Sequence, residues 1–350
     1  MKFKILSLVI MIAAVFSVSS FAQVKLTGAG STFDYPIFSK WFDLYYKMTG
    51  VQINYSSIGS GGGIQQITEG TVDFGASDAP LTPDQMNTFR SKRGTEIIHL
   101  PIIMGGVAVT YNLPSVGQGL RLDGETLADI YLGKIYKWND PRIVKLNPGK
   151  NLPNKAILVT HRSEGSGTTF IYTSYLSKVS PEWAKKVGNS TSVDWPVGLG
   201  GKGSEGVSGL ISQTQGAIGY VELAYAVQNK LPYAIMKNKD GNFIEPNFNT
   251  VTEAAAGAVK NMPKDLRAVI TNADGKNAYP ISGFSWIVVP KDIKDYSRAA
   301  ALVKFLRWGI TKGQAYAQGL YYSPLPKQVQ KLDLEKVNSI TSNGKKISVK

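Results

Sequence analysis

The chain has 350 residues, which is enough for two domains of ordinary size. Hydrophobic residues make up 43% of it and charged residues 18%, a composition that excludes disordered and fibrous proteins. The sequence contains no cysteine, and its only histidines are His99 and His161. Disulfides, thiolate metal sites, a cysteine nucleophile and a multi-histidine metal cluster are therefore excluded, and we expect neither a metal nor a cofactor.

The N-terminus has the pattern of a secretory signal peptide. Two lysines lie within the first four residues, and an apolar run broken by one serine follows at residues 5–16. Ser20 and Ala22 supply the small residues of a cleavage site before Gln23. The run is too short to span a bilayer of about 30 Å. We expect residues 1–22 to be removed between Ala22 and Gln23, leaving a soluble exported protein.

The formal net charge is +14, and loss of two lysines with the signal peptide would leave +12. A basic excess favours anionic partners, from small anions to nucleic acids and membrane surfaces. The charges are dispersed, and no five like charges are consecutive. This pattern favours a solvated basic surface, so we expect no nucleic-acid partner.

Strand and helix patterns alternate along the chain. β-branched and aromatic residues predict strands at residues 51–58, 73–77, 97–111 (with a break at Gly105 and Gly106), 157–160, 217–221 and 285–289. Helical periodicity is found at residues 35–48, 64–69, 125–132, 168–179 and 296–317. The first of these helices should bury Ile37, Trp41, Leu44, Tyr45 and Met48, and the last Ala299, Leu302, Val303, Leu306 and Ile310. The alternation predicts α/β domains with mostly parallel sheets.

Four short blocks rich in glycine and hydroxyl residues stand where strands meet helices. They are GAGSTF (28–33), GSGGG (59–63), GASD (75–78) and RSEGSGT (162–168). Glycine lets the backbone approach a ligand closely, serine and threonine donate hydroxyls, and helix N-termini present unpaired N–H groups. Several such termini directed at one point would bind an oxyanion.

Each block by itself is typical of an ordinary capped turn, and this alternative stays open for any one of them. The main enzyme motifs are absent: no serine lies between glycines at −2 and +2, and Lys202 is followed by Gly203, which excludes a Walker A loop. A G-x-G-x-x-G match at residues 198–203 follows a segment interrupted by Pro196, a poor core strand. His161 could serve as a base, but a histidine that ends a strand is more often structural.

Five motifs in order make the chain resemble the PstS family, the periplasmic phosphate-binding proteins of the high-affinity phosphate ABC transporter. They are LTGAGSTF (26–33), INYSSIGSGGG (53–63), VDFGASDAPL (72–81), HRSEGSGTTF (161–170) and WPVGLGGKG (195–203). The resemblance implies a two-lobed periplasmic binding protein fold (type II), with a mostly parallel, helix-flanked sheet in each lobe and the ligand in the cleft between them. It places crossovers near residues 99–103 and 279–283. The implied lobes are residues 23–101 plus 283–350, and residues 102–282.

The resemblance also implies the phosphate contacts. The family's motif positions carry over to Thr32, Phe33 (through its amide), Ser60, Asp78, Arg162, Ser166, Gly167 and Thr168. Glu164 stands where the best-known members have aspartate, and we expect it to support Arg162.

The implied function is that of a non-catalytic, monomeric periplasmic protein that closes around inorganic phosphate and delivers it to an inner-membrane ABC permease. Asp78 fits such a ligand, because phosphate at neutral pH keeps a hydroxyl that can donate to a carboxylate, whereas sulfate has none. Asp78 could instead cap the helix that begins at Pro83. Two alternatives stay open: a secreted phosphatase using Ser166 or Thr32, and a binder of another tetrahedral oxyanion.

Overall fold

The computed structural model describes residues 24–348. The expected signal peptide, residues 1–22, and the expected cleavage before Gln23 lie outside the described residues. Within residues 24–348, no helix combines the length and the apolar character needed to cross a membrane.

Eight strands form the principal sheet, in the order β2-β1-β3-β11-β4-β8-β6-β7, and two small sheets have the orders β10-β9-β5 and β12-β13. The strands are β1 (Lys25–Gly30), β2 (Gln52–Ser57), β3 (Phe74–Ser77), β4 (Ile97–Tyr111), β5 (Arg121–Leu122), β6 (Leu158–Arg162), β7 (Leu199–Gly201), β8 (Ala217–Glu222), β9 (Ile235–Lys237), β10 (Phe243–Ile244), β11 (Ser282–Pro290), β12 (Thr341–Ser342) and β13 (Lys345–Lys346).

Helices pack around these strands. They are α1 (Tyr35–Thr49), α2 (Ser60–Glu69), α3 (Pro83–Arg93), α4 (Gly124–Tyr131), α5 (Pro141–Leu146), α6 (Gly167–Val179), α7 (Pro181–Lys186), α8 (Gly203–Gln213), α9 (Leu223–Gln228), α10 (Phe248–Lys260), α11 (Tyr296–Ile310) and α12 (Lys327–Val337), with 3₁₀ helices at Lys312–Tyr316 and Gln318–Leu320.

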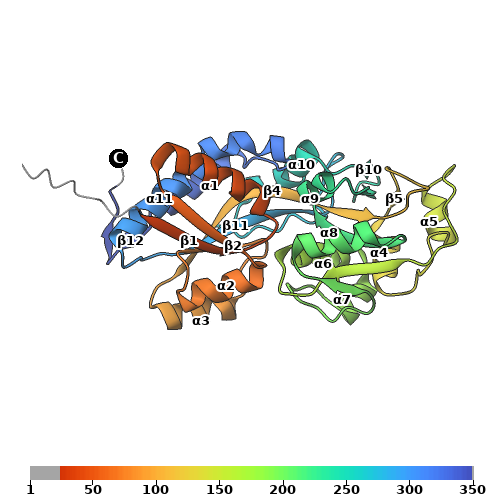
Figure 1. Ribbon diagram of the computed structural model, residues 1–350, viewed down its shortest axis with the longest axis horizontal. Helices are drawn as coiled ribbons and strands as arrows, with labels where there is room; N and C mark the ends of the chain where they lie inside the picture. The colour runs from red at the N-terminus through yellow and green to blue at the C-terminus, as the bar shows by residue number, and fades with distance from the viewer. Residues whose placement is uncertain (1–23, 349–350) are drawn as a thin grey trace, which may run out of the picture.

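The molecule is elongated and has two lobes (Figure 1). One half holds β1 and β2 with α1, α2, α3 and α11, and the other holds α4 to α8. Residues 24–348 begin and end in the first half, as the colours of Figure 1 show. The predicted α/β fold with two lobes is therefore confirmed.

The principal sheet is parallel towards its ends and antiparallel at its centre. β1 pairs with β2 and β3 in parallel, and β6 pairs with β7 and β8 in parallel. The central strand β4 is antiparallel to both of its neighbours, β11 and β8. It pairs with β11 from Ile97 to Gly106 and with β8 from Val107 onward. One long strand thus runs through the centre of the sheet and changes partner along its length.

The predicted break at Gly105 and Gly106 is wrong, because β4 continues through both residues. These glycines make room for neighbouring side chains. A Cβ added at Gly105 would lie 2.5 Å from Cζ of Phe33, and one at Gly106 would lie 3.3 Å from Cδ1 of Tyr279. A glycine pair inside a strand here indicates close packing on the sheet.

Two details of the predicted helices differ from the structure. Met48 is 57% exposed, whereas Phe38, which the helical stripe omitted, is fully buried. The last helix, predicted at residues 296–317, ends at Ile310, seven residues before its expected end, and a 3₁₀ helix follows it. The reason is tertiary: the Trp41 indole donates to the Gly313 carbonyl at 2.9 Å and packs against that glycine.

Candidate functional site

The first block ends β1 and leads into α1, and it brings Thr32 and Phe33 into the interior. Gly30 has φ +141°, and a Cβ there would lie 2.1 Å from the Ala76 carbonyl oxygen, so β1 can approach β3 only with glycine. Thr32 Oγ1 lies 2.9 Å from Ser204 Oγ at the start of α8. The Phe33 amide donates to Ser31 Oγ at 3.0 Å.

The second block is the first turn of α2 and not a loop before it. Gly59 is the N-cap with φ 88°, and the helix begins at Ser60 rather than at the predicted residue 64. Glycines allow this turn to pack tightly: a Cβ at Gly63 would lie 2.4 Å from Gly30 Cα. Ser60 Oγ accepts from the Gly167 amide at 3.0 Å and from the Asp78 amide at 3.3 Å. One hydroxyl therefore joins α2 to the third and fourth blocks.

Asp78 follows β3 and is 1% exposed. Its Oδ1 accepts from Ser31 Oγ and lies 2.8 Å from Ser285 Oγ, and its Oδ2 accepts from Thr168 Oγ1 at 3.3 Å. The alternative that Asp78 caps α3 is wrong, because Thr82 is the N-cap of that helix and forms a capping box with Gln85.

The fourth block carries Arg162 at the end of β6. The guanidinium donates through Nε to Glu164 Oε1 at 2.8 Å, through Nη2 to the same oxygen, and through Nη1 to Thr168 Oγ1 at 3.3 Å. Ser166 is the N-cap of α6, and its Oγ accepts from the Thr169 amide at 3.1 Å. The longer Glu164 side chain thus reaches Arg162, and it also accepts from the Gly203 amide at 3.1 Å.

The predicted residues gather where the N-termini of α2 and α6 meet. The Gly61 amide donates to the Gly165 carbonyl at 2.9 Å, so the two turns touch directly. The seven predicted contact residues with side chains are buried, and the most exposed of them, Arg162, is 4% exposed. The fourth block approaches the third so closely that a Cβ at Gly167 would lie 2.5 Å from the Asp78 amide nitrogen.

Acidic side chains outnumber basic ones around this point. Arg162 faces Asp78 and its partner Glu164, and two further buried carboxyls, Asp34 and Glu222, lie nearby. Burial raises the pKa of Asp78 to about 6, although hydrogen bonds from Ser31 and Ser285 and the charge of Arg162 act in the opposite direction. An anion bound here would be held by amide and hydroxyl dipoles together with one guanidinium.

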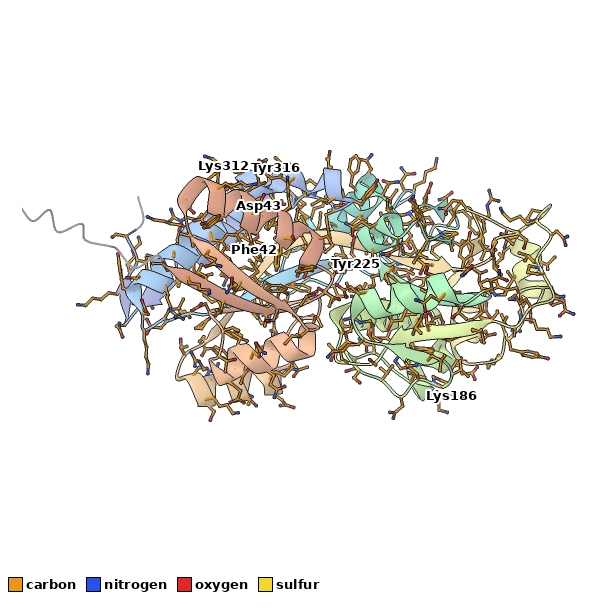
Figure 2. All side chains as sticks on the ribbon, viewed as in Figure 1. Phe42, Asp43, Lys186, Tyr225, Lys312 and Tyr316 are labelled. Atoms are coloured by element: carbon orange, nitrogen blue, oxygen red, sulfur yellow. The ribbon has the colours of Figure 1, made fainter. Side chains whose placement is uncertain are left out.

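Sequence reasoning missed several residues that build this site. They are Ser31, Asp34, Ser204, Glu222, Tyr225 and Ser285. Ser31 and Asp34 lie within or beside the first block, and Ser204 follows the GLGGKG motif, so local patterns pointed near them. Ser285 and Tyr225 belong to segments without such a pattern. The Tyr225 hydroxyl lies 2.7 Å from the Thr32 carbonyl oxygen, at the junction of the two halves (Figure 2).

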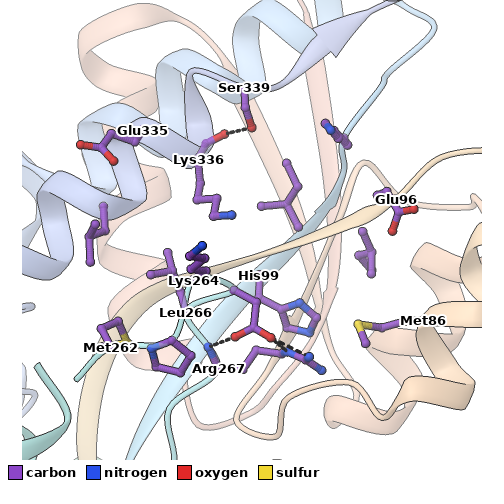
Figure 3. A pocket seen from close by; sticks show the side chains of 16 residues that line it. Met86, Glu96, His99, Met262, Lys264, Leu266, Arg267, Glu335, Lys336 and Ser339 are labelled. Carbon is purple, nitrogen blue, oxygen red and sulfur yellow. Dashed lines mark hydrogen bonds and ion pairs between the residues drawn. The ribbon is translucent and has the colours of Figure 1, made fainter.

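A cavity of about 740 Å³ lies elsewhere, and none of the predicted residues is among those that line it. Lys264 and Lys336 extend into it, and Arg267 is paired with Asp265 on its wall (Figure 3). His99 also lines this cavity, and its Nε2 accepts from the Leu81 amide at 3.1 Å. This accepting nitrogen fits the structural role of a neutral histidine, because burial lowers the pKa of His99 to about 3.

The chain matches the model of the PBP superfamily domain over residues 17–312. A phosphate-binding protein PstS from Pasteurella multocida is 46% identical over 94% of this chain and 95% of its own length. A phosphate-binding protein PstS from Xylella fastidiosa is 48% identical over 88% of this chain and 84% of its own length.

Solved structures agree on the fold. An ancestral soluble variant of the human phosphate binding protein is 20% identical, has a TM-score of 0.72 and covers 92% of this chain and 99% of its own. A phosphate-binding protein from Stenotrophomonas maltophilia is also 20% identical, has a TM-score of 0.66 and covers 89% of this chain and 93% of its own. The chain therefore belongs to the PBP superfamily and, within it, to the PstS family of phosphate-binding proteins.

Proposed function

We propose that this protein is the substrate-binding component of a phosphate ABC transporter, which binds inorganic phosphate and releases it to a membrane permease. The observation that carries the proposal is the buried meeting point of Ser60, Asp78, Arg162 and Thr168, supplied by three separate segments. The names of the relatives, phosphate-binding protein PstS, support the same ligand.

The ligand contacts in this proposal are Thr32, Phe33, Ser60, Asp78, Arg162, Ser166, Gly167 and Thr168, with Glu164 holding Arg162. Asp78 supplies the selectivity. Its carboxylate accepts a hydrogen bond from a phosphate hydroxyl, whereas fully ionised sulfate meets it as a like charge. A buried site that requires a ligand hydroxyl can reject an analogue lacking it by roughly 10⁴–10⁵.

Binding in this proposal closes two lobes, residues 23–101 plus 283–350 and residues 102–282. Ser60 and Asp78 belong to the first lobe, and Arg162, Gly167 and Thr168 to the second. Hydrogen bonds that join the two sets, such as Gly167 N to Ser60 Oγ at 3.0 Å, support a state in which the lobes touch around the site. A ligand held by both lobes favours that state by its differential affinity.

The alternative of a secreted phosphatase has less support. Ser166 Oγ is engaged as the cap of α6, and Thr32 Oγ1 lies beside Ser204 Oγ rather than beside a base. His161 stacks on Trp195 with ring centroids 4.8 Å apart, and its Nδ1 lies 3.0 Å from the Arg162 carbonyl oxygen. These contacts favour binding without catalysis. Export to the periplasm, a monomeric state and the permease partner are parts of the same proposal.

Calorimetric titration of the phosphate-free protein with phosphate, sulfate and arsenate tests the function. We expect tight phosphate binding and much weaker sulfate binding. Equal binding of phosphate and sulfate would remove the phosphate assignment. Release of phosphate from a generic monoester, lost in Ser166→Ala or Thr32→Val, would instead establish the phosphatase.

A further inference from the structure

Three side chains form a buried line that leads away from the candidate site. Asp34 and Ser285 are 0% exposed, and Asp78 is 1% exposed. Ser285 Oγ, on β11, lies 2.7 Å from Asp34 Oδ2 and 2.8 Å from Asp78 Oδ1. Asp34 is at the N-cap position of α1, yet its side chain caps no helix amide and is directed to Ser285 instead.

Counting protons points to one neutral carboxyl. A serine hydroxyl has a single proton, so Ser285 can give a near-linear hydrogen bond to Asp34 or to Asp78 but not to both. If both carboxyls were ionised, one of the two short contacts would place a lone pair of the hydroxyl oxygen against a carboxylate oxygen. Both contacts are hydrogen bonds when one carboxyl keeps its proton and donates it to Ser285 Oγ.

The surroundings favour Asp34 as the neutral member. Asp78 also accepts hydrogen bonds from Ser31 and Thr168 and lies in the field of Arg162, all of which favour its ionised form. Asp34 contacts Ser285 alone through its carboxyl, and its Oδ1 has no hydrogen-bond partner. Burial and the charge of Asp78 hold the pKa of Asp34 well above its usual range.

Other titratable groups face this line from several elements. They are Tyr55 on β2, Arg162 on β6, Glu222 on β8, Tyr225 on α9 and Tyr322 before α12. Glu222 is fully buried, and burial with the charge of Asp78 raises the pKa of its carboxyl well above the usual range. A negative charge on Asp34 would be opposed by the charge of Asp78 as well as by burial.

We propose that Asp34 is a positioning residue for phosphate selectivity: it stays protonated, donates to Ser285, and so makes Ser285 donate to Asp78 Oδ1. This proposal rests on the proposed function, since phosphate is the ligand that Asp78 would read. Oδ1 already accepts from Ser285 and Ser31, whereas Oδ2 accepts only from Thr168, so Oδ2 keeps a lone pair for a phosphate hydroxyl. The proton on Asp34 thus sets both the charge of Asp78 and the oxygen it presents.

The first experiment compares Asp34→Leu with Asp34→Asn, two side chains of similar size of which only asparagine can donate to Ser285. Leucine removes the donor to Ser285 Oγ, and with it the polarisation that strengthens the Ser285–Asp78 hydrogen bond, so it should weaken phosphate binding about tenfold. Asparagine restores a donor and should recover most of that loss. Ser285→Ala should match Asp34→Leu. Phosphate and sulfate are titrated into each variant by calorimetry, with thermal unfolding as the check on folding.

The second experiment reads the proton directly and needs no ligand. The wild-type protein is labelled with ¹³C at the aspartate side-chain carboxyl, and the Asp34 resonance is assigned as the one absent from Asp34→Asn. It should keep the chemical shift of a protonated carboxyl from mildly acidic to neutral pH. An Asp34 signal that titrates in the usual aspartate range overturns the proposal, even if the leucine variant fails to fold.

The outcomes separate this proposal from the proposed function. A wild-type protein that binds no phosphate removes both. A wild-type protein that binds phosphate, with equal affinity in Asp34→Leu, Asp34→Asn and Ser285→Ala, removes the role of Asp34 alone. Tighter phosphate binding in Asp34→Asn than in wild type would show that Asp34 is ionised, and would likewise overturn the proposal.

Discussion

Arg162 is the residue whose removal should have the largest effect on phosphate binding. A guanidinium has five N–H donors. Two of them are used on Glu164, and one on Thr168. Two donors remain for a bound anion. Arg162 is 4% exposed, so bulk water does not compete with the anion for these donors.

The expected loss follows from these two donors. Hydrogen bonds to charged groups contribute about 1.5–3 kcal/mol each, so two of them contribute about 3–6 kcal/mol. Arg162→Ala should therefore weaken phosphate binding by a factor of about 10²–10⁴. Arg162→Ala would also leave the half-buried Glu164 carboxylate without its ion-pair partner, which places the expected value towards the upper end.

Isothermal titration calorimetry at fixed ionic strength measures the change in the phosphate-free protein. Arg162→Lys is the matched control: it keeps the charge but loses the planar fork, so its affinity should fall between those of wild type and alanine. The double variant Arg162→Ala with Glu164→Gln should recover part of the loss. A folded Arg162→Ala protein that binds phosphate within tenfold of wild type would refute the reasoning, because the guanidinium would then not touch the ligand.

Four further predictions concern the same site. Asp78→Asn should keep phosphate affinity within a modest factor, because the amide oxygen still accepts a hydrogen bond from a phosphate hydroxyl. It should strengthen sulfate binding, because the like charge is removed. Unchanged sulfate affinity in competition calorimetry would contradict this prediction. Because burial raises the pKa of Asp78 to about 6, protonation of Asp78 below that pH removes the repulsion between its carboxylate and sulfate. The wild-type protein should therefore bind sulfate more tightly as the pH falls through 6, whereas the sulfate affinity of Asp78→Asn should not change over this range. In the ligand-free protein the pKa of Asp78 in the folded state lies above its unfolded value of 3.8, so ionised Asp78 destabilises the fold above pH 6. This destabilisation is lost as the pH falls from 6 toward 3.8. Denaturant titrations at several pH values would detect the change in the free energy of unfolding. Gly167→Ala places a Cβ 2.5 Å from the Asp78 amide nitrogen and 2.6 Å from Ser60 Oγ, so it should hold the lobes apart and lower phosphate affinity at least about tenfold. The control is Gly209→Ala, whose added Cβ has no atom within 4 Å. This control should change neither the phosphate affinity nor the compaction that solution scattering measures on binding.

Local sequence determined much of the framework. The predicted strand at residues 51–58 is β2 to within one residue at each end, because β-branched and aromatic residues favour a strand. The stripe from Ala299 to Ile310 is buried in α11, because a period of 3.6 indicates which side of a helix faces the core. The glycine and serine blocks marked the strand-to-helix junctions for the same local reason: φ values such as +88° at Gly59 and a cap such as Ser166 need those residue types.

Tertiary structure decided what those patterns could not specify. Met48 continues the helical stripe of α1 but is 57% exposed, whereas Tyr45, one turn earlier, is buried. Gly105 and Gly106 looked like a break, yet β4 passes through them. Glycine is needed at 105 because the ring of Phe33 occupies the space that a side chain would fill. Such packing depends on residues distant in the sequence, which local periodicity does not record.

The candidate site shows the same division. Its four blocks are visible in the sequence because each is a local turn with its own glycines and caps. The line from Asp34 through Ser285 to Asp78 is not visible, since Ser285 is 251 residues from Asp34 and 207 from Asp78. A serine in a buried strand carries no local sign of its partners. The sequence by itself therefore determined where a ligand could be held, whereas the fold decided which buried carboxyls share a hydroxyl, because a hydrogen bond depends on distance in space and not on separation along the chain.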